Sequence, residues 1–138
     1  MLMWNENFAT GDKMIDEQHR VLFDTINRLE GLLFQTNPNH EEIEFILGLV
    51  TYLESYIKDH FQLEEGCMEQ HRCPAHAQNK IAHAQFIARF EEFRRHCRAE
   101  GFRLELLSQL HQSLHQWIEQ HILRVDIQLK PCLARTAA

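Results

Sequence analysis

The sequence predicts an all-α protein, an up-down-up-down antiparallel four-helix bundle with an irregular N-terminal arm. Four long stretches repeat apolar residues every third or fourth position, which is the period of an amphipathic helix. Short turn segments separate these stretches at residues 36–40, 71–76 and 99–101. No stretch alternates apolar and polar residues, so no strand is expected. Short connections between long helices make consecutive helices antiparallel, and a bundle follows.

The whole chain, residues 1–138, is expected to form a single domain, because this length buries a core without disulfides or metals. Residues 1–15 are predicted to be the N-terminal arm, and Asp16 is the candidate N-cap of the first helix. We interpret residues 127–138 as a tail or as the start of a linker.

Composition excludes several classes of function. The net charge is −6 and Lys and Arg do not cluster, so neither a nucleic acid nor an anionic membrane is expected as a partner. The N-terminus has no basic segment followed by an apolar run, which favours a cytoplasmic location. The four cysteines form no C-x-x-C pair, so free, packed thiols are expected in a reducing compartment.

The apolar face of each predicted helix carries a histidine, and the second helix adds a glutamate one turn after its own. The predicted core-facing residues are His19, Leu22, Phe23, Ile26, Leu29 and Leu33 in the first helix; Phe45, Leu49, Leu53, Tyr56, His60 and Glu64 in the second; Asn79, His83, Phe86, Phe90, Phe93 and Cys97 in the third; and Leu107, Leu110, Leu114, Trp117, His121 and Val125 in the fourth.

This coincidence across four helices indicates a metal site. A single core histidine is more often a hydrogen-bonded structural residue, but a buried glutamate requires a compensating positive charge, which a metal ion provides. Imidazole with carboxylate suits iron, zinc, copper or nickel. The number of ligands favours two metals that share an oxygen ligand over a single zinc. The histidines predicted to lie outside this site are His40, His71, His96, His111 and His115, with His76 near its entrance.

Four segments carry a resemblance to a known family. No histidine has a glutamate three positions before it, which argues against a ferritin-like di-iron oxidase. The segments GDKMIDEQH (11–19), HFQLEE (60–65) and WIEQHILRVD (117–126), with the Cys-Pro pair before the third helix and its His83, resemble the bacterial hemerythrins. These proteins are non-heme di-iron bundles that bind oxygen. The similarity extends over nearly the whole chain.

The resemblance implies a di-iron centre with an oxo or hydroxo bridge and O2 as its external ligand. The implied ligands are His19 and His60 for one iron, His83 and His121 for the other, and Glu64 and Asp126 as bridges. Asp126 comes from the resemblance alone. It lies five residues after His121, so it reaches the site only through a local widening or the end of the helix. The resemblance also implies that Trp117, Ile118 and Ile122 line the oxygen pocket.

The family's third histidine on the second iron falls at Asn79. An asparagine is a poor ligand for ferric iron, so we interpret this as a vacant ligand position where Asn79 hydrogen-bonds a water or coordinates weakly through its carbonyl. A water or hydroxide ligand favours the ferric state, which predicts rapid oxidation rather than oxygen storage. The alternative is that Asn79 reflects drift in a domain that no longer binds two metals.

The preferred function is therefore an oxygen or redox sensor, the sensory module of a larger signalling protein such as a diguanylate cyclase, with a C-terminal effector domain. One alternative is a free-standing reversible oxygen carrier. Another is a di-iron enzyme that reacts with peroxide or nitric oxide, but no acid or base can be assigned for it, so the domain itself is not expected to be an enzyme. The oligomeric state stays open.

Overall fold

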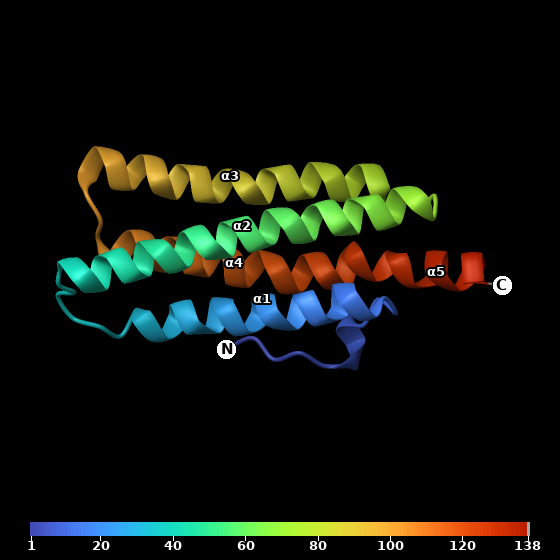
Figure 1. Ribbon diagram of the computed structural model, residues 1–138, viewed down its shortest axis with the longest axis horizontal. Coiled ribbons are helices and arrows are strands. Elements are labelled where there is room, and N and C mark those ends of the chain that lie inside the picture. Colours follow the sequence, from blue (N-terminus) through green and yellow to red (C-terminus); the bar gives the residue numbers. More distant parts are fainter. Residues whose placement is uncertain (138) are drawn as a thin grey trace.

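Four long helices lie side by side in the computed structural model, which describes residues 1–137 (Figure 1). They are α1 (Lys13–Leu32), α2 (His40–Gln70), α3 (His76–Glu100) and α4 (Leu104–Arg124). Each helix packs against the next, and α1 also packs against α4, which closes the bundle. The predicted four-helix bundle is confirmed, and residues 1–137 contain no strand.

The first helix begins earlier than predicted. Its N-cap is Asp12, whose Oδ1 accepts a hydrogen bond from the Ile15 amide at 2.9 Å. The assignment of Asp16 as the N-cap is wrong, because this carboxylate instead accepts 2.8 Å bonds from the amide and the hydroxyl of Thr10. Asp16 therefore holds the N-terminal arm against the first turn of α1.

The N-terminal arm contains a 3-10 turn, η1 (Glu6–Phe8), and runs back along α1 (Figure 1). Phe8 is buried and packs edge-on against Phe23, with ring centroids 5.2 Å apart. The guanidinium of Arg20 lies 4.0 Å from the ring centroid of Trp4, which is a cation–π contact. The arm thus closes one side of the core.

The helical period places most predicted core residues correctly, with one clear error on α2. Phe45 is 56% exposed, whereas its neighbour Ile46 is fully buried. The buried face of α2 repeats through Ile46, Leu49 and Leu53, so Phe45 lies about 100° off that face. The predicted core residues that the structure leaves half-buried are Leu33, Tyr56, Cys97 and Trp117.

The chain after α4 is helical to Ala137, and Ala138 lies outside the described residues. A 3-10 turn, η2 (Asp126–Gln128), leads into α5 (Leu129–Ala137), at one end of the bundle (Figure 1). Leu129 and Cys132 are buried in a second apolar cluster with Ile15 and Met68. The segment interpreted as a tail or linker is therefore packed on the bundle as far as Cys132.

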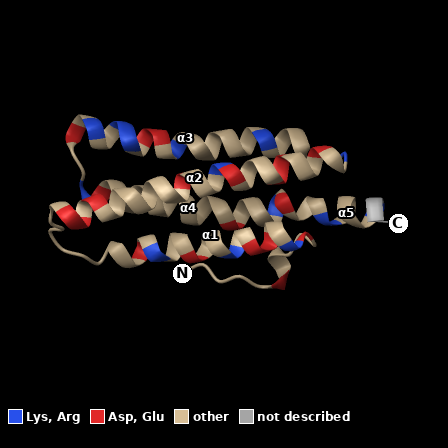
Figure 2. Ribbon diagram, in the orientation of Figure 1, with Lys and Arg blue, Asp and Glu red and all other residues tan. Residues whose placement is uncertain are grey.

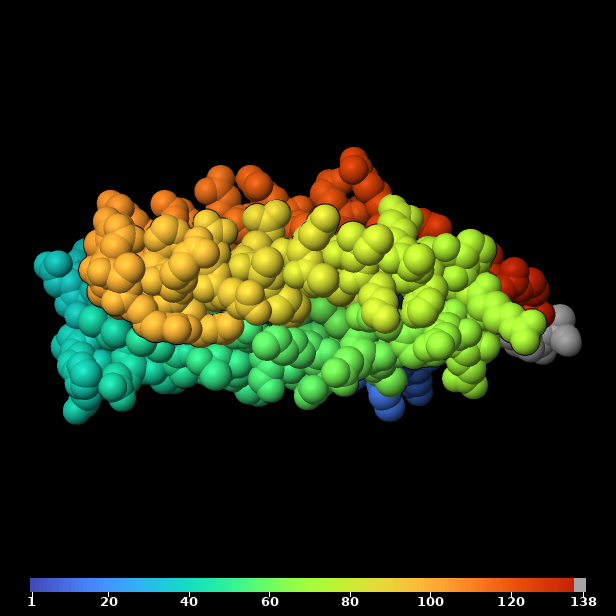
Figure 3. Space-filling model, turned by 90° about the horizontal axis from the view of Figure 1, so that it is seen from above, coloured from blue at the N-terminus to red at the C-terminus, as the bar shows by residue number. Residues whose placement is uncertain are grey.

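Acidic and basic residues are interspersed along the helices (Figure 2). Figure 3 shows the elongated face that α2 and α3 form together. None of the helices in the described part of the chain has the length and apolar character needed to cross a membrane.

Candidate metal centre

Six buried side chains able to bind metal meet inside the bundle. They come from all four long helices and from the turn after α4, and each is 7% exposed or less. These residues are the six ligands inferred from the sequence: His19, His60, Glu64, His83, His121 and Asp126. They divide into two groups of converging donor atoms, His19, His60 and Glu64 in one and Glu64, His83, His121 and Asp126 in the other.

The carboxylate of Glu64 belongs to both groups. Its Oε2 lies 2.9 Å from Nε2 of His19 and 2.8 Å from Nε2 of His60. Its other oxygen, Oε1, lies 3.0 Å from Nε2 of His83. The two oxygens therefore face histidines of different donor groups, as a bridge between two metals requires.

Asp126 also contacts a histidine of each donor group. Its Oδ2 lies 3.3 Å from Nε2 of His19, and its Oδ1 lies 3.1 Å from Nε2 of His121. This placement depends on the end of α4 at Arg124, because Val125 adopts φ −114° and ψ −58° and the chain continues as a 3-10 turn. The end of the helix turns Asp126 inward. On a continuous helix, the five-residue spacing would keep it away from His121.

The donor set fits metal ions better than it fits a hydrogen-bonded cluster. Among the described residues, Nε2 of His60, Nε2 of His83 and Oδ1 of Asp126 have no hydrogen-bond partner, although each lies within 3.1 Å of a site atom. Ligand atoms about 2.0–2.2 Å from one ion are separated by about 3 Å, which matches these distances. The mixture of imidazole and carboxylate suits iron, zinc, copper or nickel.

Two of the histidines are oriented by partners on other helices. Nδ1 of His60 lies 2.7 Å from Oε1 of Gln18, and Nδ1 of His83 lies 2.9 Å from Oε2 of Glu65. Such bonds fix the ring and make Nε2 the atom that faces the metal. Nδ1 of His19 has no partner in the described residues.

Asn79 is fully buried beside the second group, on the same face of α3 as His83. Its Nδ2 donates to Oε1 of Glu64 at 3.2 Å and to Sδ of Met68 at 3.3 Å. Its Oδ1 accepts from Nε2 of His121 at 2.6 Å. The amide therefore contacts two of the six donor residues without supplying an imidazole.

The electrostatics of the cluster show what charge it needs. Burial lowers the pKa of His19, but hydrogen bonds with Asp126 and Glu64 outweigh this and raise it to about 10. Burial raises the pKa of Glu64, but the neighbouring His60, His19 and His83 bring it well below its ordinary value. Protonated histidine thus balances the buried carboxylates when no metal is bound, and a metal cation would displace those protons.

Aromatic rings enclose the second group. Phe61 stacks on His83 with centroids 3.6 Å apart, and Trp117 stacks on His121 with centroids 4.1 Å apart. Ile118 and Ile122, inferred to line the oxygen pocket, are buried core residues next to these rings in the chain. Trp117 is half-buried and, with His121, borders a surface groove. This groove brings solvent to the edge of the second group.

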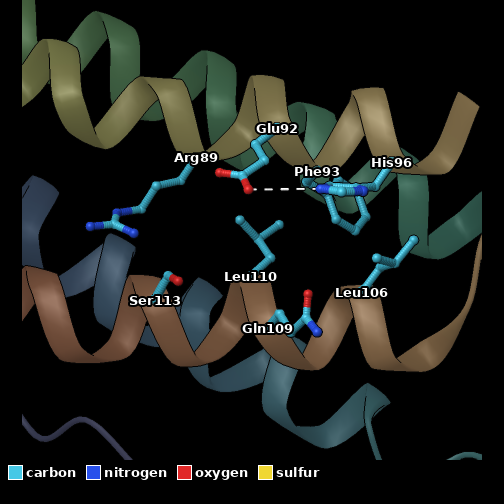
Figure 4. Close-up of a pocket in the computed structure, with 8 residues that line it drawn as sticks. All are labelled: Arg89, Glu92, Phe93, His96, Leu106, Gln109, Leu110 and Ser113. Carbon is cyan, nitrogen blue, oxygen red and sulfur yellow. Dashed lines mark ion pairs between the residues drawn. The ribbon is translucent and has the colours of Figure 1, made fainter. Parts of the chain in front are cut away.

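The remaining histidines are outside both groups. His40 is exposed and His76, at the first residue of α3, is half-buried. His111 is half-buried and burial lowers its pKa, but it belongs to neither donor group, as predicted. His96 lines a separate cavity of about 200 Å³ between α3 and α4, where it pairs with Glu92 (Figure 4).

Sequence periodicity did not identify Gln18, Glu65 or the ring of Phe61 as parts of this site. Gln18 and Glu65 each orient a histidine of a neighbouring helix, so no spacing within one helix reveals the contact. The available signal was their place inside the motif segments, directly beside His19 and Glu64.

The chain is similar to known proteins over most of its length. Residues 10–133 match the hemerythrin family, described as the hemerythrin HHE cation binding domain. The Bacteriohemerythrin of Pseudomonas aeruginosa is 32% identical over 126 residues, which covers 91% of this chain and 76% of that protein. The one from Stenotrophomonas maltophilia is 29% identical over 122 residues, 88% of this chain and 74% of that protein. The one from Methylococcus capsulatus is 25% identical over 135 residues, 97% of this chain and 98% of that protein.

Proposed function

Because this chain belongs to the hemerythrin HHE cation-binding family, we propose that its six converging side chains hold two iron ions and that the pair acts as an oxygen or redox sensor. The metal assignment rests on the contacts of the two carboxylate oxygens of Glu64. One oxygen faces His19 and His60, and the other faces His83. A carboxylate that served only as a core anion would not need to present its two oxygens to histidines of different donor groups.

In this proposal His19 and His60 bind one iron, His83 and His121 bind the other, and Glu64 and Asp126 bridge them. Bound iron would supply the redox chemistry with oxygen. The protein supplies the rest: Gln18 and Glu65 hold the rings of His60 and His83, and burial excludes bulk water from the donors.

Asn79 supports a sensor over a carrier. Its amide lies where the family places a third histidine, and it is bonded to Glu64 and His121. The second iron then has fewer nitrogen ligands from the protein, and a position is left for an oxygen ligand. Oxygen ligands stabilise the higher oxidation state, so oxidation is favoured over reversible oxygen binding.

A route for the signal starts at Asp126. This ligand opens the η2 turn, and α5 follows it directly. A change in how Asp126 is held would therefore move the start of α5, where Leu129 is buried. We place the C-terminal effector of the sensor after α5. Hydrogen exchange of residues 129–137 should differ between the reduced and the oxidised protein, and equal exchange would contradict this coupling.

The deciding experiment is to load the protein with iron, quantify two irons per chain, reduce it without oxygen and follow the visible spectrum in air. We expect direct passage to a stable diferric spectrum. Oxygen uptake that degassing reverses would instead support the reversible carrier, which the burial of the donor set favours. Catalytic consumption of peroxide or nitric oxide would support an enzyme.

A further inference from the structure

Two buried thiols lie beside each other at the end of the bundle, outside the metal centre. Cys73 stands in the turn between α2 and α3, and Cys132 stands on α5. They are 4% and 3% exposed. Fifty-nine positions separate them in the sequence, so only the folded chain brings them together.

Both sulfurs use the same acceptor. Sγ of Cys73 lies 3.5 Å from the carbonyl oxygen of Gln128, and Sγ of Cys132 lies 3.4 Å from that same oxygen. The two thiols are also close enough to influence each other: burial raises the pKa of Cys132, and the neighbouring Cys73 raises it further. A disulfide requires the two sulfurs to approach to about 2.05 Å, so both side chains must turn toward each other.

The backbone on both sides is held in place. The amide of Cys73 donates to the carbonyl of Met68 at 2.8 Å, which fixes the turn. From the other side, the guanidinium of Arg135 on α5 donates to the carbonyl of His71 at 3.1 Å. Figure 3 shows α5, in red, beside the turn that joins α2 and α3.

We propose that Cys73 and Cys132 are a modification site, a dithiol that hydrogen peroxide oxidises to an intramolecular disulfide joining α5 to the α2–α3 turn. The thiolate of one cysteine attacks a peroxide oxygen, the O–O bond breaks, and the leaving hydroxide takes a proton to become water. The second thiol attacks the resulting sulfenic acid, the S–O bond breaks, and a second water leaves as the S–S bond forms. Two thiols lose two electrons, and one peroxide gains them.

Peroxide is suited to this pair because it is small enough to reach buried sulfur. Reaction is expected to be slow at neutral pH, since the attacking species is the thiolate and these thiols are buried. The product would tie α5 to the bundle covalently. Because α5 follows Asp126 directly, the disulfide would restrain the segment next to the metal centre without touching its ligands.

Of the other two cysteines, Cys67 could form a competing disulfide and Cys97 serves as a control. Cys67, near the end of α2, is half-buried and close enough for the charge of Cys73 to influence its pKa, although burial is the main cause of that rise. Cys97 lies near the end of α3, on the other side of the core, and packs against a different apolar cluster. A Cys67–Cys73 link is thus the competing product, and Cys97 should take no part.

Each cysteine lies in its own tryptic peptide, so the link can be identified directly. Cleavage after Lys and Arg, except before Pro, releases Cys73 in CPAHAQNK (73–80) and Cys132 in VDIQLKPCLAR (125–135). The full chain, iron-loaded, is treated with hydrogen peroxide, alkylated and digested without reductant. We expect these two peptides joined, with a mass about 2 Da below their sum, and separated again by dithiothreitol.

Variants separate this result from its alternatives. Cys132→Ser should abolish the link, and Cys97→Ser should form it as the original protein does. The wild-type peptide result does not depend on whether Cys132→Ser folds. Joining of CPAHAQNK to the Cys67 peptide (59–72), a link between two chains, or sulfinic acid without any link would each overturn the proposal. Iron content and the air-oxidation spectrum of Cys132→Ser should match those of the original protein, because neither cysteine is a proposed ligand.

Discussion

The side-chain amide of Asn79 donates a hydrogen bond to Oε1 of Glu64 at 3.2 Å while its carbonyl accepts one from His121 at 2.6 Å. One neutral side chain thus links the proposed bridging carboxylate to a proposed histidine ligand. The resemblance to hemerythrins implies a further imidazole at this position. We propose that the character of the second metal site, and with it the choice between sensing and carrying oxygen, depends on this residue.

Asn79→His should slow oxidation of the reduced protein in air, by about 10-fold or more, because an added imidazole saturates the second iron. Stopped-flow spectroscopy of the anaerobically reduced protein measures the rate. Asn79→Ala, which removes the amide without adding a ligand, is the matched control and should not slow the reaction. An unchanged rate in Asn79→His would show that the asparagine is incidental.

Glu64→Ala should weaken the binding of both metals by more than about 100-fold, since a shared bridge is a stronger contributor than an outer hydrogen-bond partner. Iron per chain after reconstitution and desalting is the measurement. His115→Ala is the control, because His115 is in neither donor group, and it should keep both irons. Full iron in Glu64→Ala would rule out the bridging role.

Glu65→Ala tests the orientation of His83. Loss of the carboxylate 2.9 Å from Nδ1 of His83 should lower metal affinity by about 10–100-fold while the fold is kept. Competition with a chelator gives the affinity, and circular dichroism checks the fold. Glu69→Ala, at an exposed position on the same helix, should leave the affinity unchanged, and the idea is lost if the two variants behave alike.

The metal-free protein should lose stability as pH rises from 6.5 to about 10. The pKa of His19 is raised from 6.5 to about 10 in the folded state, so its stabilising contribution is complete below pH 6.5 and disappears as the pH rises through about 10. Urea unfolding across this range measures the change. The iron-loaded protein should not follow this dependence, because a bound metal replaces the proton on His19.

Phe90→Ala should reduce the free energy of unfolding by about 3–5 kcal/mol, because the ring is fully buried and its removal leaves a cavity. Phe45→Ala should change it by less than about 0.5 kcal/mol, since this side chain is 56% exposed. Thermal or urea denaturation of the metal-free proteins gives both values. Comparable losses would mean that α2 presents Phe45 to the core after all.

The amino-acid pattern alone predicts the four helices, their turns and the histidine on each buried face. Those features follow from the 3.6-residue period, which is a property of each helix alone, and His19, His60, His83 and His121 are buried as that period requires. The prediction from the helical period failed at Phe45. The first residue of the buried face of α2 was placed one position too early, which put an exposed ring in the predicted core. It also failed at Asp16, because two acidic residues stand near the start of α1 and only the fold shows which one caps it.

Contacts between side chains of different elements follow from the folded structure and not from the pattern within one helix. The split of the Glu64 oxygens, the orientation of His60 by Gln18 and the shared acceptor of Cys73 and Cys132 all join separate elements. Asp126 reaches the site because α4 stops at Arg124 and the chain turns, which the helical period cannot express. Contacts between elements depend on how helices are rotated and offset against one another, and that is set by packing of the whole core.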